Sequence, residues 1–309
     1  MSRERGVALI TAIVLVAIAT VLAVHVGTRA ALDLRRTAGL AALEQGWHVA
    51  LGAEAWAAEV LRKDLENSQT PIDHLGEAWA QPLPPLPIDG GEVRGALEDM
   101  QGRFNLNSLV NEARDVDDAA VQRFSTLLSL IGAEPRWAPI MADWIDADTD
   151  SGVPEGAEDG TYLSQNPPYR SANGLVATTT EMMALPGMTR EEFERIRPYV
   201  AALPPSEKIN VCTAKGPVLM ALVGGATDYS DPELLAANRR DGCYPTIEFL
   251  KGPLSTTDRQ TLDKLAEEKS DWFRAVTAVR IGTSEFTLYS LIERNGNSIR
   301  TVLRSTGTE

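Results

Sequence analysis

The chain has 309 residues and is strongly acidic, with 29 Lys and Arg residues against 43 Asp and Glu residues and a formal net charge of −14. Binding to a phosphate backbone needs clustered Lys and Arg, so this composition argues against a nucleic-acid partner. A chain of this length can hold two modest domains.

The first predicted element is a membrane-spanning helix. Residues 7–26 contain no Asp, Glu, Lys or Arg. A span needs about 20 mainly apolar residues, whereas the apolar core of a signal peptide has roughly 7–15. Helical spacing of apolar residues then continues to Leu61, and the first Pro is Pro71. We therefore expect one helix over residues 7–66, transmembrane and then amphipathic, roughly 90 Å long at 1.5 Å per residue. The alternative is an ordinary signal anchor followed by a separate helix.

A short basic leader precedes this helix. Arg3 and Arg5 favour a cytoplasmic leader by the positive-inside rule, which places the body in the periplasm of a single-pass inner-membrane protein. The junction between Gly6 and Val7 resembles the class III signal that prepilin peptidases cut. On this interpretation the six-residue leader is removed after Gly6, and the mature, methylated end is Val7.

The fifth position of that mature chain is Thr11. Most pilin-like subunits carry Glu there, and an ionised Glu in a bilayer is costly unless it finds a partner. In the pilin picture the partner is the terminal amine of the subunit above. An uncharged Thr11 therefore suits a subunit that has nothing above it; the alternative is that Thr11 is simply a tolerated small residue.

A region rich in Pro and Gly over residues 70–91 follows the helix and marks a boundary. The next stretch, GEVRGALEDMQGRFNLNSLV, predicts a strand, a turn and a second strand. Its core, GRFNLNSL, resembles the K-subunit family of type II secretion systems, the large minor pseudopilins. The resemblance also covers the leader, the apolar helix, the DWID…GAED loop and the closing strands. It implies a pilin fold that a helical domain interrupts.

Residues 113–203 predict this helical insertion. The expected helix signals are Asp115 as a cap, Gly132 as an end, Pro135 as a start, and the capping-box pairs Thr178 with Glu181 and Thr189 with Glu192. The turn LPGM between the last two helices resembles a helix–hairpin–helix DNA-binding module. Because acidic and basic side chains nearly cancel beside it, we expect a structural hairpin and no nucleic acid.

The strongest chemical signal is the acidic loop DWIDADTDSGVPEGAEDGTYL. Between Arg136 and Arg170 there is no Lys or Arg, and the seven carboxylates are Asp143, Asp146, Asp148, Asp150, Glu155, Glu158 and Asp159. Calcium takes six to eight oxygen ligands, which alternating Asp residues can supply. The Asp residues at 146, 148 and 150 match the first, third and fifth positions of an EF-hand loop. The later Gly and acidic residue are shifted by one position, so this is not a proper EF-hand.

We therefore expect a structural calcium site, which the resemblance to the K-subunit family also implies. The expected ligands are Asp146, Asp148, Asp150, Glu158 and Asp159. Magnesium keeps its waters and prefers fewer protein ligands. A solvated acidic loop without a metal is the alternative.

The last third of the chain returns to strands. RAVTAVRIG, EFTLYSLIER and SIRTVLRS alternate, with a predicted hairpin turn at Asn295–Gly296. A short strand near Ile209 and a helix over GPVLMALVGG precede them. Cys212 and Cys243 are an even pair in an exported body, so we expect a disulfide, worth roughly 3–4 kcal/mol in the chain-entropy model. Two buried free thiols are the alternative.

Together these elements predict an α+β, pilin-like fold, in which a long N-terminal helix packs on an antiparallel sheet and a helical insertion interrupts the domain. The predicted divisions are a leader at 1–6, the helix at 7–66, the first pilin-type part at 67–112, the insertion with its metal loop at 113–203, and the second pilin-type part at 204–309.

The three His residues are scattered, and no HExxH, GxSxG or P-loop motif occurs, so we do not expect an enzyme. The family resemblance implies a structural subunit at the tip of the periplasmic pseudopilus, processed by prepilin peptidase and bound to the minor pseudopilins I and J. The alternatives are a minor or tip pilin of a type IV pilus or competence machine, and a membrane-anchored calcium-dependent hydrolase.

Overall fold

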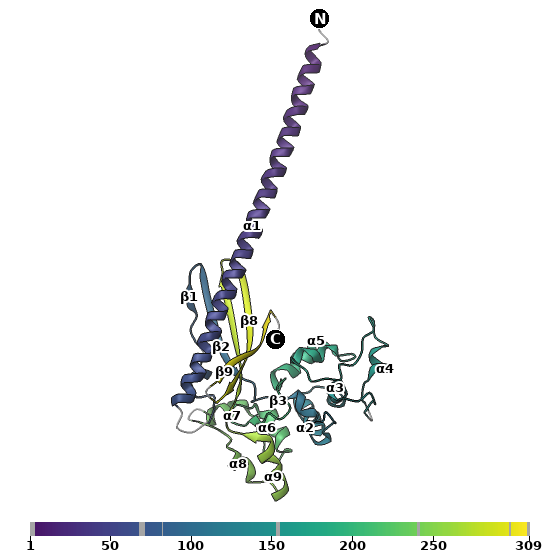
Figure 1. Cartoon of the computed structure of the whole chain (residues 1–309), viewed down its shortest axis with the longest axis vertical. Helices are drawn as coiled ribbons and strands as arrows, with labels where there is room; N and C mark the ends of the chain where they lie inside the picture. Colours follow the sequence, from purple (N-terminus) through teal and green to yellow (C-terminus); the bar gives the residue numbers. More distant parts are fainter. Residues whose placement is uncertain are drawn as a thin grey trace.

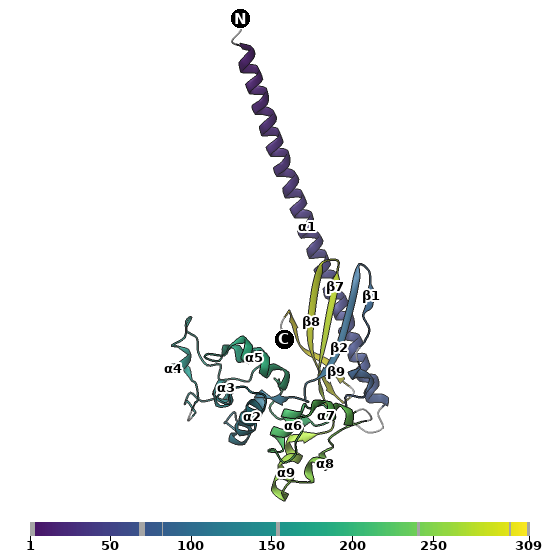
Figure 2. The same ribbon diagram turned by 180° about the vertical axis from the view of Figure 1, so that it is seen from behind.

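One helix, α1 (Glu4–Asn67), determines the shape of the molecule (Figures 1 and 2). Its 64 residues make it about 96 Å long at 1.5 Å per residue. The side chains of residues 7–38 are exposed, whereas Ala50 and Leu61 are fully buried. The single long helix is therefore confirmed, with an apolar first half that no part of the body covers.

The structure is a computed structural model that describes residues 4–67, 72–81, 83–152, 155–239, 242–296 and 298–307, with side chains from residue 7 onward. The strands are β1 (Leu86–Ile88), β2 (Gly91–Asp99), β3 (Phe104–Asn105), β4 (Val200–Ala201), β5 (Ile209–Asn210), β6 (Ala266–Glu267), β7 (Trp272–Ile281), β8 (Ser284–Asn295) and β9 (Ser298–Thr306). The further helices are α2 (Asp118–Leu130), α3 (Trp137–Ile145), α4 (Asp159–Tyr162), α5 (Arg190–Ile196), α6 (Gly216–Leu222), α7 (Pro232–Asn238), α8 (Ile247–Lys251) and α9 (Thr256–Leu265). Short 3₁₀ helices lie at η1 (Ala78–Ala80), η2 (Leu106–Leu109), η3 (Thr179–Ala184) and η4 (Arg197–Tyr199).

The second half of α1 packs on a five-stranded antiparallel sheet in the order β1-β2-β7-β8-β9. Alternation along β7 and β8 turns every second side chain toward the helix. Trp47 of α1 meets Phe286 edge to face, with ring centroids 5.9 Å apart, and Trp79 meets Phe273 at 5.1 Å. This arrangement is the pilin architecture expected from the sequence.

A buried carboxylate fixes α1 on the sheet. Glu54 is 7% exposed. Its side chain accepts a hydrogen bond from Ser290 of β8 at 2.6 Å and two from Arg304 of β9 at 2.7 and 2.8 Å. Charge-assisted bonds of this kind hold the helix in one register on the strands.

The insertion leaves the sheet after β2 and returns at β7. Its buried side chains form one continuous core from Phe104 to Ala266, in which α2 packs against both α3 and α6. The expected boundary at residues 203 and 204 lies inside this core. Residues 204–271 therefore belong with the insertion and not with the sheet, because the apolar faces of α6 to α9 have their partners there. Figures 1 and 2 show the insertion beyond and beside the end of the sheet that is farthest from the N-terminus.

Several local expectations differ in detail. The cap of α2 is Asp117, which accepts from Ala120 N at 3.0 Å, whereas the expected cap Asp115 is held in a turn by Asn111. The second strand expected after β2 is only β3, which pairs in parallel with β4 of the insertion.

Of the two expected capping boxes, one forms completely and the other only in part. Thr178 and Glu181 form the expected box. Thr189 caps α5, but Glu192 accepts instead from Glu134 N at 2.8 Å. In the last hairpin Asn295 pairs with Ser298, so Asn295 still belongs to the strand pair and Gly296 follows it; residue 297 lies outside the described residues.

A buried polar network joins the insertion to the sheet at the point where the chain leaves and returns. Asp99, at the end of β2, accepts hydrogen bonds from Asn210 at 3.1 Å, from Ser270 at 2.7 Å and from Thr213. Asn210 also donates to Asp73 O at 2.9 Å. We call these five residues the junction network. Asp73, Thr213 and Ser270 lie in the segments that connect α1, the insertion and the sheet, while Asp99 ends β2 and Asn210 ends β5, so the network sets the relative position of these parts.

Replacing Asn210 by Ala should lower the free energy of unfolding by about 2–4 kcal/mol, because fully buried partners lose their hydrogen bonds without access to water. Chemical unfolding of the purified chain, followed by Trp fluorescence, measures this change. The matched control is Asn238→Ala at an exposed position in α7, where we expect a change within about 0.5 kcal/mol. Equal effects of the two substitutions would contradict the role of the network.

Candidate functional site

The apolar half of α1 is the candidate membrane span that the described residues contain, and no part of its apolar window is buried. Thr11 lies within it. The Thr11 hydroxyl donates to Ala8 O at 2.9 Å and lies 3.2 Å from Val7 O. Its hydrogen-bonding capacity is therefore used inside its own helix, and no second subunit is needed to satisfy it. The backbone at Gly6 and Val7 is helical, and cleavage between them stays a prediction.

The acidic loop begins where α3 ends. α3 is buried along nearly its whole length, and this anchors Asp146, its C-terminal cap, below the surface. Oxygen atoms of Asp146, Asp148 and Glu158 all lie within 4.8 Å of one another. Asp146 is 2% exposed and Glu158 is 5% exposed. We call these three residues the loop carboxylates.

The loop carboxylates bring several negative charges together, with Arg114 as the nearby cation that acts on Asp146. One oxygen of Asp146 and both oxygens of Glu158 are buried and have no hydrogen-bond partner among the described residues. Burial, followed by repulsion from neighbouring carboxylates, raises the pKa of Asp146 to about 7 and raises the pKa of Glu158. Buried oxygens of this kind are costly unless a cation or a donor meets them. The residues therefore fit a hard cation such as calcium.

Two of the expected ligands lie elsewhere. Asp150 is outside the cluster, and its N–H donates to Asp148 at 2.8 Å. Asp159 accepts from Ser171 N at 3.1 Å and lies 3.6 Å from the Arg170 guanidinium. Of the three Asp positions that match the EF-hand spacing, Asp146 and Asp148 lie in the cluster and Asp150 does not; the calcium ligand set stays a prediction.

Two residues outside the expected ligand set shape the loop. Asp143, 2% exposed, accepts from Gly152 N at 2.9 Å and Ala157 N at 2.8 Å, which folds the loop back on α3. Asn173 donates to Asp148 O at 2.5 Å, and its own side-chain oxygen is buried with no hydrogen-bond partner in the part of the chain that the structure describes. Asp143 is one of the seven carboxylates of the loop, so the sequence marks it as a candidate. Asn173 lies 25 residues after Asp148, and no sequence pattern near it predicts this contact.

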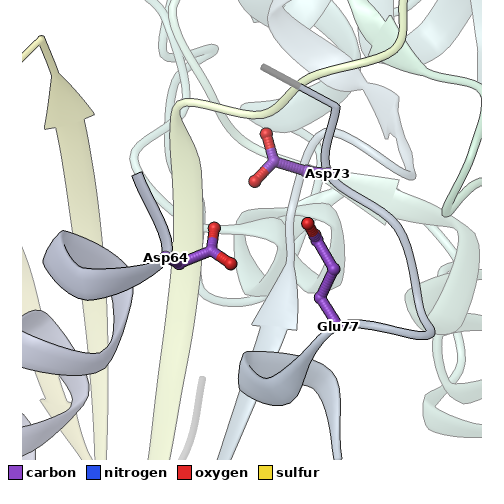
Figure 3. A group of neighbouring side chains, drawn as sticks. All are labelled: Asp64, Asp73 and Glu77. Carbon is purple, nitrogen blue, oxygen red and sulfur yellow. The ribbon is translucent and has the colours of Figure 1, made fainter. Parts of the chain in front are cut away.

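A second carboxylate cluster lies at the far end of α1. Asp64, Asp73 and Glu77 point toward one another, from α1 and from the segment that follows it (Figure 3). Arg294 of β8 meets Asp73 at 2.6 Å through both carboxylate oxygens and Asp64 at 3.2 Å. Burial and the neighbouring acids Glu77 and Asp73 raise the pKa of Asp64 to about 6, and Arg294 opposes this. The cation of this cluster is therefore a side chain of the protein.

The predicted disulfide is present. Cys212 and Cys243 are bonded, with their Cα atoms 4.6 Å apart. The bond ties the segment before α6 to the segment before α8, and Cys212 is fully buried in the insertion core. The disulfide links two residues that are 31 positions apart, which restricts the unfolded chain and thereby stabilises this part of the insertion.

The long helix on an antiparallel sheet defines a pilin-like subunit. A chain of the crystal structure of the GspK-GspI-GspJ complex from the enterotoxigenic Escherichia coli type 2 secretion system has the same fold, with a TM-score of 0.77 and 25% sequence identity over 89% of this chain and 100% of that chain. The family model for the type II secretion system protein K matches residues 102–205.

Relatives extend the match to the whole chain. Type II secretion system protein K of Pseudomonas aeruginosa is 36% identical over 98% of this chain and 93% of its own length. The protein K of Klebsiella pneumoniae is 32% identical over 99% and 97%. The chain belongs to the type II secretion system protein K family. It is a structural pseudopilin subunit and not an enzyme.

Arg294→Met should destabilise the protein by about 3–5 kcal/mol, because it leaves the buried Asp73 carboxylate without its cation. The matched control is Arg300→Met, which removes an exposed pair with Glu293 and should cost less than about 1 kcal/mol. Urea unfolding compares the two variants. A large effect of added calcium on Arg294→Met alone would show that this cluster can also hold a metal, contrary to the assignment above.

Proposed function

We propose that this chain is the tip subunit of the periplasmic pseudopilus, where it helps to start or cap assembly together with minor pseudopilins of types I and J. The observation that carries the proposal is the place of the insertion. It extends beyond and beside the end of the sheet farthest from the membrane helix (Figure 1). A subunit stacked above this one would have to share that space.

The membrane end supports the same position. Thr11 offers no charge to a subunit above it, and its hydroxyl is satisfied within α1. The exposed apolar half of α1 can pack against the helices of the subunits beneath it in a filament, and this packing does not need a charge pair to a subunit above. A tip position therefore agrees with both ends of the molecule.

The partner assignment rests on similarity. The structure whose fold this chain shares was solved as a complex of GspK with GspI and GspJ. Coexpression of the full chain with the I-type and J-type subunits of its own secretion system should yield a stable complex that survives size-exclusion chromatography in detergent. Pilins of a type IV pilus from the same cell are the matched control. Association with those pilins and not with the I and J subunits would overturn the proposal in favour of a pilus or competence subunit.

The loop carboxylates support calcium as a structural cofactor, since their buried oxygens lack donors and lie close together. The ion would link α3 to the segment at Glu158 and so order the outer part of the insertion. Chelation should therefore lower the melting temperature. At a calcium concentration a hundredfold above Kd, the ion adds about 2.7 kcal/mol to the free energy of unfolding.

Differential scanning calorimetry tests this prediction. Calcium should restore the melting temperature better than magnesium, and Asp148→Ala combined with Glu158→Ala should abolish the response. The matched control is Asp150→Ala, an acidic residue of the same loop that lies outside the cluster, which should leave the response in place. A melting temperature that neither the chelator nor calcium changes would contradict the proposal and would leave a solvated acidic loop without a metal.

The leader junction supports processing by prepilin peptidase and anchoring of the helix in the inner membrane, with the body in the periplasm. Gly6→Leu should leave the six-residue leader attached, because a peptidase that accepts Gly has little room for a branched side chain. Mass spectrometry of the N-terminus measures the result. Ala8→Leu, on the other side of the junction, is the control. A mature chain that starts anywhere other than Val7 would contradict the assignment.

A further inference from the structure

Between its apolar segment and the body, α1 forms a bare stalk (Figures 1 and 2). The contacts of α1 with the body begin near Gln45, whose side chain donates to Asp89 O at 3.2 Å. Residues 27–44 therefore separate the apolar segment from the body by about 27 Å at 1.5 Å per residue. No role described above uses the side chains of this stalk.

Three exposed arginines follow the apolar segment closely: Arg29, Arg35 and Arg36. The acid among them is Asp33, so residues 29–36 carry a net charge of +2 in a chain whose net charge is −14. We call the three arginines the basic collar. Arg29 and Arg36 are seven residues apart and lie on one face of α1, whereas Arg35 lies on a neighbouring face.

The basic collar lacks strong acidic partners. Among the described residues, Arg29 and Arg35 form no hydrogen bond or ion pair. Arg36 lies 3.7 Å from Asp33, but 77% of the Arg36 side chain and 72% of the Asp33 side chain are exposed. An exposed pair of this kind contributes little. The collar can therefore meet anions from outside the chain.

The basic collar also lies at the depth of lipid headgroups. The hydrocarbon core of a bilayer is about 30 Å thick, and the headgroup regions bring the total to about 40–45 Å. Residues 7–26 fill this core at 1.5 Å per residue. Arg29 then lies about 4–5 Å beyond the core along the helix axis, and Arg36 about 15 Å beyond it. A long side chain can reach back from there, and tilting of α1 brings it closer.

The orientation of the chain does not account for the basic collar. Basic residues favour the cytoplasmic side of a span, and Arg3 and Arg5 of the leader already supply them there. The collar lies at the opposite end of the apolar segment. It therefore opposes this bias and needs another role.

We propose that the basic collar binds the phosphate groups of anionic phospholipids in the leaflet that faces the body, and so fixes the depth of α1 in the bilayer. Guanidinium groups bind phosphate through two parallel hydrogen bonds, and a basic segment beside a span is attracted to an anionic surface. The acidic body does not cancel this attraction, because exposed charges are screened over about 8 Å at physiological salt. The proposal rests on the inner-membrane anchoring proposed above.

Electron paramagnetic resonance of the full chain, reconstituted in phosphatidylcholine vesicles, tests the collar. Trace spin-labelled phosphatidylglycerol or phosphatidylcholine, with the same acyl chains, reports how much of each lipid α1 immobilises. Phosphatidylglycerol should associate at least threefold more strongly. Combining Arg29→Gln, Arg35→Gln and Arg36→Gln should bring the two lipids to equal association and leave the melting temperature of the body unchanged, because these positions are exposed on the stalk.

The matched control removes three exposed cations outside the collar, through Arg62→Gln, Lys63→Gln and Arg94→Gln. It changes the net charge by the same amount and should keep the preference for phosphatidylglycerol. Inorganic phosphate, compared with chloride at equal ionic strength, should also leave this preference in place.

Equal association of the two lipids with the unchanged chain, or an equal loss of preference in the control, would overturn the proposal. Loss of the preference in inorganic phosphate alone would identify a simple anion site instead. A collar variant that keeps the preference and loses the I-type and J-type subunits would assign the collar to a partner helix and would overturn the proposal too. Failure of the unchanged chain to enter the vesicles would contradict the anchoring itself, which is distinguishable from entry without a lipid preference.

Discussion

The hydrogen bonds around Asp99 and Asn210 hold the three parts of this subunit together. Both side chains are buried, and between them they connect the end of β2, the segment before α6, the start of β7 and the segment after α1. The adjoining pair of Asp73 with Arg294 extends the connection to β8. If one member were lost or displaced, the remaining buried polar groups would lack hydrogen bonds with no water to replace them. The network is therefore satisfied in only one arrangement of the insertion relative to the sheet.

The two carboxylate clusters have similar residues but different partners, and the partners determine whether a cluster forms an ion pair within the fold or fits a metal ion. At the end of α1 three acids lie together (Figure 3), and Arg294 from the sheet pairs with two of them, Asp64 and Asp73, so the cluster is part of the fold. In the acidic loop one oxygen of Asp146 and both oxygens of Glu158 have no hydrogen-bond partner among the described residues, and the loop carboxylates fit a metal ion. Composition alone marks both as acidic, and only the position of Arg294 separates them.

Features governed by local pattern could be predicted from the sequence: the single helix α1, the long strands β7 to β9, the cap at Thr178 and the disulfide. Features that depend on distant contacts could not. The return of the chain to the sheet only at Trp272 follows from long-range packing: α6 packs against α2, and α7 to α9 each bury a Leu in the same core. Which acids belong to the loop carboxylates depends on how the loop folds back, with the Gly152 and Ala157 N–H groups donating to Asp143; Asp150 and Asp159 are not members of the group.

We propose a filament-end position because the insertion lies at the end of the sheet farthest from the N-terminus, and the position of the subunit in an assembled pseudopilus tests this proposal most directly. A gold-binding tag placed in the exposed turn at Gly224 and Gly225 can be located by electron cryotomography of pseudopili in cells. The account predicts one label for each pseudopilus, at the end distal to the inner membrane. Labels spread along the filament, or found at its base, would contradict it.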